Sequence, residues 1–80
     1  MAVVTVIAVE KGGDAFATAF SDGTCSVLTY LAGPRVRVGD QADARFDWTG
    51  QARLIVVNGV CWARVRSHPV SREVALASFP

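Results

Sequence analysis

A group of arginine, tryptophan and aliphatic residues lies on both sides of the dipeptide Asn58-Gly59. Its seven members are Arg53, Ile55, Val57, Val60, Trp62, Arg64 and Arg66. Tryptophan beside arginine can stack a nucleic-acid base while the guanidinium groups bind phosphate. The same two residue types also anchor protein–protein interfaces. The chemistry that this group favours is therefore binding, either of a protein or of single-stranded nucleic acid.

A β-hairpin would bring these side chains onto one surface. Asn-Gly is the strongest two-residue hairpin signal, and it predicts strands at 52–57 and 60–67 with Val57 opposite Val60 and Leu54 opposite Ala63. Because side chains alternate along a strand, one face is wholly apolar and is expected to face the core: Ala52, Leu54, Val56, Cys61, Ala63 and Val65. The opposite face carries the seven residues named above, and we call it the outer face.

Two largely apolar faces on one hairpin require either a second internal core or a partner. Residues 70–80 could supply that core, since Val74, Leu76 and Phe79 are apolar and could lie on the outer face. The conformation of this segment has two interpretations. Ser71 can cap a short helix that runs through Leu76, or the alternating apolar residues can form an edge strand, which we favour.

The length of the loop after the preceding strand, 41–48, decides which side chains of that strand join the outer face. Its apolar residues Ala42, Ala44, Phe46 and Trp48 alternate with Asp43, Arg45 and Asp47. A two-residue loop would place the charged set beside Leu54 in the core, where burial is costly. We therefore predict a three-residue loop with Gly50 in a left-handed conformation, which places Phe46 beside Ala52 and Ala44 beside Leu54. The two aspartates then lie near Arg45 and Arg53, where exposed ion pairs contribute little.

Composition and turn spacing predict an all-β fold. The chain has 80 residues, of which 51% are hydrophobic, and with 13 valines and 12 alanines but only 4 leucines it is too rich in β-branched residues for a helical bundle. Gly, Asp, Asn and Pro clusters divide it into short segments, as in a β-meander or small barrel. We expect one domain, residues 1–80, built as an OB-like or SH3-like antiparallel barrel of five to seven strands. The expected segments are 3–10, 15–20, 24–31, 35–38, 41–48, 52–57 and 60–67.

Charge, cysteines and the N-terminal segment suggest the cellular setting. Eight basic and seven acidic residues give a net charge of +1, so no strong field attracts the whole chain to nucleic acid or to a membrane. Cys25 and Cys61 lie in apolar runs without the short paired spacing of metal or redox sites, and are expected to be buried thiols. The apolar start has no basic residues before it and is too short to span a membrane. We expect a cytoplasmic protein with no membrane partner.

The order of turn signals in the first two thirds of the chain resembles a known family. An apolar strand is followed by Glu10-Lys11-Gly12, an aromatic strand, Asp22-Gly23, and later Val38-Gly39-Asp40. Residues 3–57 thus resemble the cold-shock type of OB barrel. The resemblance implies binding of single-stranded DNA or RNA by aromatic residues of the second and third strands, here Phe16, Phe20 and Tyr30.

The alternation of residues gives those aromatics another interpretation. If Asp22-Gly23 is a two-residue turn, Phe16 and Phe20 share a face with Cys25 and Val27 and belong to the core. Tyr30 is expected to pack against small residues while its hydroxyl reaches solvent.

No pattern in the chain favours catalysis. The one histidine, His68, precedes Pro69 and most simply ends a strand. The sequence has no nucleophile elbow, phosphate-binding loop or metal-ligand cluster, so we expect no enzyme activity, no cofactor and no metal. The predicted function is protein–protein association, with a second copy or another protein, through the outer face. The alternative is binding of single-stranded nucleic acid.

Overall fold

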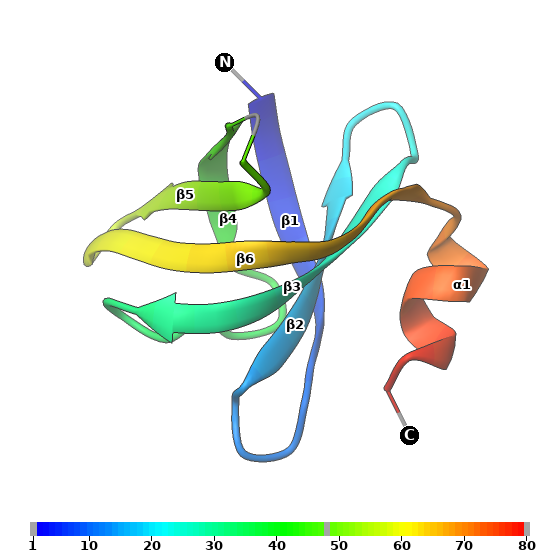
Figure 1. The fold of residues 1–80 in the computed structure, drawn as a ribbon, viewed down its shortest axis with the longest axis horizontal. Coiled ribbons are helices and arrows are strands. Elements are labelled where there is room, and N and C mark those ends of the chain that lie inside the picture. Colours follow the sequence, from blue (N-terminus) through cyan, green and yellow to red (C-terminus); the bar gives the residue numbers. More distant parts are fainter. Residues whose placement is uncertain (1, 48, 80) are drawn as a thin grey trace.

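The computed structural model describes residues 2–47 and 49–79, which form six β-strands and one short helix (Figure 1). These are β1 (Ala2–Val9), β2 (Ala15–Phe20), β3 (Cys25–Ala32), β4 (Gln41–Phe46), β5 (Gln51–Val56), β6 (Gly59–Val70) and α1 (Arg72–Ala77). All neighbouring strands are antiparallel, and they close into a barrel in the order β1-β2-β3-β6-β5-β4. The predicted small antiparallel barrel is confirmed.

Two three-stranded meanders, β1-β2-β3 and β4-β5-β6, make up the barrel. β1 pairs with β4 and β3 pairs with β6, which joins the two meanders on both sides. The segment between β3 and β4, residues 33–40, contains no strand, so the strand predicted at 35–38 is wrong. This connection instead buries Val36 in the core, while the Arg35 guanidinium donates to the carbonyl oxygen of Gly13 at 2.8 Å.

The barrel interior is formed by the alternate side chains that the binary pattern marks as apolar. Phe16, Leu28 and Leu54 are the largest fully buried side chains, and they pack with valines and alanines from the other strands. The inward face predicted for β5 and β6 is confirmed, since Leu54 and Cys61 are fully buried and Val56 and Val65 are partly buried against them.

The register predicted for the β5–β6 hairpin is wrong by two residues. Val57 and Asn58 form the turn, Val56 pairs with Gly59, and Leu54 pairs with Cys61 instead of Ala63. Asn58 keeps a negative φ and Gly59 alone takes a positive one, 136°, as in a type I turn followed by a glycine bulge. A shift of two residues preserves the direction of every side chain, so the predicted faces are unchanged.

The three-residue loop predicted between β4 and β5 is confirmed. Phe46 pairs with Ala52 and Ala44 with Leu54, and Gly50 has a φ of 90°. Trp48, which we predicted on the inward face, lies outside the described residues. Among the described residues, no ion pair within 4.0 Å joins the aspartates of this hairpin to its arginines, so the expected ion pairs do not form.

The C-terminal segment is a helix, so the strand that we favoured is wrong and the alternative is confirmed. Ser71 is the N-cap, and its hydroxyl accepts a hydrogen bond from the backbone N–H of Val74 at 3.2 Å. The helix packs its buried Ala75 against Ala17, Cys25 and Val27 on the outside of β2 and β3, where it completes a second small core. Alanine side chains on β2 leave room for this close approach.

The β2–β3 connection explains why the second core excludes Phe16 and Phe20. The backbone N–H of Phe20 donates to the carbonyl oxygen of Thr24, and Ala19 pairs with Cys25. The loop therefore has three residues, 21–23, in place of the expected two, and this odd difference moves each β2 side chain to the other face relative to β3. Ala17 and Ala19, and not the two phenylalanines, share a face with Cys25 and Val27.

Candidate functional site

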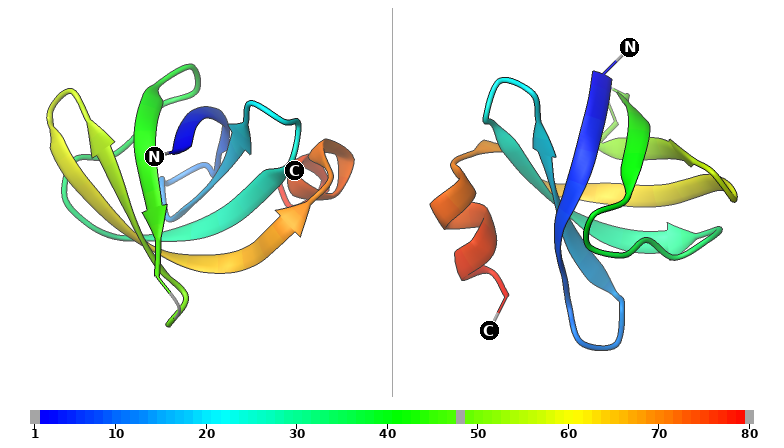
Figure 2. Two further views of the ribbon diagram at one scale, coloured as in Figure 1. Left: turned by 90° about the horizontal axis from the view of Figure 1, so that it is seen from above. Right: turned by 180° about the vertical axis from the view of Figure 1, so that it is seen from behind.

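The outer face is exposed to solvent along its whole length. Val57 is fully exposed, and the exposed fractions of Ile55, Trp62 and Val60 are 45%, 42% and 37%. Arg53, Arg64 and Arg66 are exposed on the same two strands. Helix α1 stands on the opposite side of the barrel from the β5–β6 turn, and all views agree on this arrangement (Figures 1 and 2). Residues 70–79 therefore do not cover the outer face.

The cross-strand register extends the outer face over β4 and β1. Ile55 lies opposite Asp43, which in turn lies opposite Val3, and the Val3 side chain is 53% exposed. Two residues further along the strands, Arg45 of β4 lies opposite Arg53 of β5, and Arg53 lies opposite Trp62 of β6. The seven predicted residues did not include Arg45 or Val3. The three-residue loop that we inferred was the signal for Arg45, because it places Arg45 and Arg53 on the same face.

A hollow of about 250 Å³ lies beside Trp62 and is lined by Arg45, Phe46, Asp47, Gln51, Arg53 and Trp62. The guanidinium carbon of Arg53 is 5.7 Å from the centre of the Trp62 ring, within the range of a cation–π interaction. Two guanidinium groups and an indole ring at a hollow of this size can bind a small anionic group with an attached apolar portion.

Asp47, the one carboxylate that lines this hollow, is engaged by its own turn. It accepts hydrogen bonds from the Thr49 hydroxyl at 2.6 Å and from the backbone N–H groups of Thr49 and Gln51 at 2.9 and 3.0 Å. The Thr49 hydroxyl and then the Gln51 N–H hold the pKa of Asp47 below its ordinary value of 3.8. The carboxylate is therefore an anion that stabilises the loop rather than a partner of the arginines.

The three aromatic residues indicated by the cold-shock resemblance do not lie on one exposed surface. Phe16 is 1% exposed in the core, which leaves no ring face for a base. Phe20 is partly buried at one end of the barrel. The Tyr30 hydroxyl donates to the carbonyl oxygen of Gly33, and the Arg35 guanidinium carbon lies 4.3 Å from the centre of its ring.

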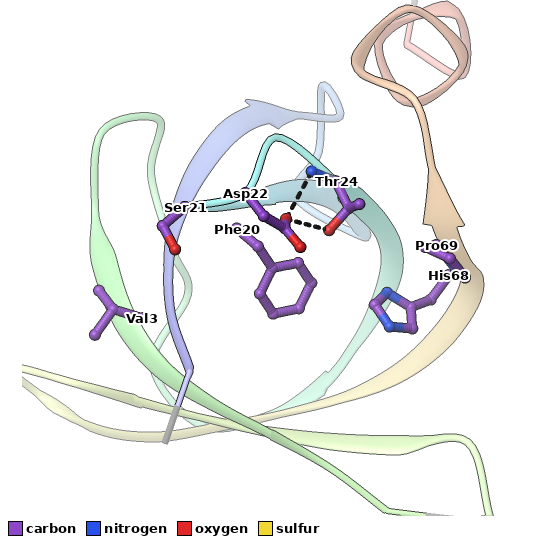
Figure 3. Close-up of a pocket in the computed structure, with 7 residues that line it drawn as sticks. All are labelled: Val3, Phe20, Ser21, Asp22, Thr24, His68 and Pro69. Carbon is purple, nitrogen blue, oxygen red and sulfur yellow. Dashed lines mark hydrogen bonds between the residues drawn. The ribbon is translucent and has the colours of Figure 1, made fainter.

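A second hollow, of about 550 Å³, opens at the end of the barrel beside the β2–β3 loop (Figure 3). The residues that line it are Val3, Phe20, Ser21, Asp22, Thr24, His68 and Pro69. The rings of Phe20 and His68 point toward one another, with their centres 5.4 Å apart, and the Phe46 ring is 4.9 Å from His68. No sequence pattern indicated this hollow, because the residues that line it are far apart in the chain.

The geometry of this second hollow does not form a nucleophilic site. The His68 Nδ1 atom and the Ser26 hydroxyl are hydrogen-bonded at 2.6 Å, but Ser26 is fully buried and cannot reach a substrate. Asp22 accepts from the Thr24 hydroxyl at 2.7 Å and from its N–H at 2.9 Å, and these bonds lower the pKa of Asp22. His68 is thus a packing and hydrogen-bonding residue, and β6 continues past it to Val70.

Within residues 2–47 and 49–79, no cluster of three or more histidine, cysteine or acidic side chains is arranged to hold a metal ion. Cys25 and Cys61 are free and buried, as expected, and burial raises the pKa of the Cys61 thiol. No helix in the described part of the chain is long and apolar enough to cross a membrane.

Comparisons with known proteins found no matching family model, no matching curated protein and no matching solved structure. The architecture is compatible with an OB-like barrel, and no family match supports the cold-shock resemblance. The fold and the exposed residues define the protein as a small antiparallel β-barrel with an arginine-rich, apolar outer face.

Proposed function

We propose that this protein is a non-catalytic binding module that associates with another protein chain through its outer face. The observation that carries the proposal is the run of uncovered apolar side chains along β5 and β6, namely Ile55, Val57, Val60 and Trp62. Contiguous apolar surface of this kind marks interaction sites, and tryptophan and arginine are among the residue types enriched at their energetic centres.

Site-specific photo-crosslinking in cells that express the protein tests this proposal. Benzoylphenylalanine in place of Val57 would sit on the outer face, and the matched control carries it in place of Val38, which is 64% exposed in the β3–β4 connection. We expect a discrete protein adduct from position 57 that is weak or absent from position 38. Equal crosslinking from both positions would refute the proposal. Mass spectrometry of the adduct distinguishes a second copy of this chain from a different protein.

Binding of single-stranded nucleic acid is the second candidate. Its support is the Arg45–Arg53 pair beside the Trp62 ring, together with the resemblance of residues 3–57 to the cold-shock type of OB barrel. This function predicts that an oligonucleotide quenches the fluorescence of Trp62 in a Trp48→Phe variant, with an affinity that falls as salt rises. Absence of quenching at low salt would remove this candidate.

A further inference from the structure

We infer that the partner of the outer face presents an acidic side chain, whose carboxylate binds between Arg45 and Arg53 beside Trp62. This inference rests on the proposed function, because it specifies the chemistry of the protein that docks there. The site is the hollow of about 250 Å³ on β4, β5 and β6.

The first argument is the unbalanced charge of the hollow. Arg45 and Arg53 are directly opposite each other on neighbouring strands, an arrangement of like charges that is destabilising by itself. Neither guanidinium lies within 4.0 Å of a carboxylate in the described part of the chain, where the ion pair that forms joins Arg35 to Asp14. Two adjacent guanidinium groups with no carboxylate partner among the described residues favour an anionic ligand, and their planar geometry suits a carboxylate.

The other charged groups of this face do not neutralise the pair. Asp47 is occupied by hydrogen bonds from its own turn. Asp43 is half-buried between Val3 and Ile55, and its Oδ1 atom is buried without a hydrogen-bond partner. Arg64 and Arg66 add further positive charge on β6. The outer face therefore complements an acidic surface.

The second argument is the character of the apolar surface beside the hollow. Nucleic-acid bases stack on aromatic rings, whereas Ile55, Val57 and Val60 are aliphatic, and Trp62 is the one aromatic among the exposed large apolar side chains of the described residues. Aliphatic surface beside an anion site fits a protein segment that carries both aliphatic and acidic side chains. A two-fold pairing of the outer face with a second copy would instead bring the same excess of arginines from both chains into one interface.

The experiment uses two synthetic peptides as probes, acetyl-Leu-Glu-Val-Glu-Leu-amide and the same peptide with glutamine in place of glutamate. Binding is followed by NMR through the Nε–H signals of Arg45 and Arg53 and the indole N–H signal of Trp62. A titration of these signals detects weak binding, with dissociation constants in the millimolar range, as well as tight binding. We expect the glutamate peptide to shift these signals with an affinity roughly tenfold above that of the glutamine peptide, because charge-assisted hydrogen bonds are the stronger ones.

Arginine variants supply the specificity control. R45Q and R53Q should each abolish the preference for glutamate, whereas R37Q, at an exposed position outside this face, should leave it unchanged. Circular dichroism verifies that each variant keeps the fold.

Other results would overturn the inference. Equal binding of both peptides, or no binding of either, refutes the carboxylate site, while crosslinking from position 57 still decides the proposed function independently. Tighter binding of a short oligothymidylate than of the glutamate peptide, measured from the same signals, would refute the inference in favour of nucleic acid.

Discussion

Leu54 and Ile55 are neighbours in β5 but face opposite environments. Leu54 is fully buried in the barrel, and Ile55 is 45% exposed on the outer face. We expect Leu54→Ala to lower the free energy of unfolding by about 2–5 kcal/mol, because it removes buried methyl groups and leaves a cavity. Ile55→Ala should lower the free energy of unfolding by no more than about 1 kcal/mol. Urea denaturation of both variants measures the difference, and equal losses would mean that the outer face is packed in solution.

The lowered pKa values of two aspartates predict how the free energy of unfolding depends on pH. Hydrogen bonds from Thr24 and Thr49 lower the pKa values of Asp22 and Asp47 below 3.8 in the folded chain. A lowered pKa in the folded state contributes stability above 3.8 that is lost as pH falls through the folded value. Unfolding free energies measured from about pH 5 to about pH 2 should therefore decline.

The decline should be shallower in the double variant with Asp22→Asn and Asp47→Asn, because neither position then titrates. Thr49→Val tests whether the Thr49 hydrogen bond lowers the pKa of Asp47, because it removes the hydroxyl that is the main influence on that pKa. We expect the pKa of Asp47 to rise toward its ordinary value in this variant. An unchanged slope in the double variant would show that other groups cause the acid sensitivity.

Among the elements, the β3–β4 connection depends on glycine at one position for two reasons. Gly33 and Gly39 have nearly equal φ values of 95° and 96°, which a residue with a Cβ rarely adopts. A Cβ at Gly33 would also overlap the carbonyl oxygen of Val60, whereas none of the described atoms lies within 4 Å of a Cβ at Gly39. Gly39→Ala should lower the free energy of unfolding by about 1–3 kcal/mol, and Gly33→Ala should lower it by clearly more. Urea denaturation of both variants measures the difference. Equal costs would mean that Val60 moves freely.

Helix α1 protects the second core from solvent. Ala75 is buried against Cys25, and Ala77 on the same helix is exposed. We expect Ala75→Gln to detach the helix and to raise the rate at which the Cys25 thiol reacts with a disulfide reagent, measured in a Cys61→Ser background. Ala77→Gln is the matched control and should leave the rate unchanged. Equal rates in both variants would show that the helix does not shield Cys25.

The faces of the strands could be predicted from the sequence, whereas the hairpin register and the position of the helix could not. Alternation places Leu54 inside and Trp62 outside regardless of a two-residue shift, so the faces were predictable although the hairpin register was not. The predicted two-residue turn needs a positive φ at both Asn58 and Gly59, whereas Gly59 alone has a positive φ in the structure, so the turn lies one residue earlier. The position of α1 was beyond prediction because it depends on a distant surface of small side chains on β2. Likewise, the hollow at His68 joins strands that the sequence does not show to be neighbours.

At the scale of the whole molecule, the arginines of the outer face oppose self-association by two-fold pairing. We expect the purified protein to sediment as a monomer at micromolar concentration and low salt, with Trp62→Ala sedimenting identically. A dimer that dissociates on dilution and disappears in Trp62→Ala would instead identify a second copy as the partner. That outcome would keep the outer face as the interface and refute an exclusively acidic partner.

Barrel closure limits how a partner can recognise this protein. Each strand of the described sheet has a paired neighbour on both sides over part of its length. A partner therefore finds no full-length free edge to which it could add a strand of its own, which is a common and sequence-tolerant mode of peptide binding. Selectivity then depends mainly on side chains, and closure also shortens the edges through which small β-proteins most readily aggregate.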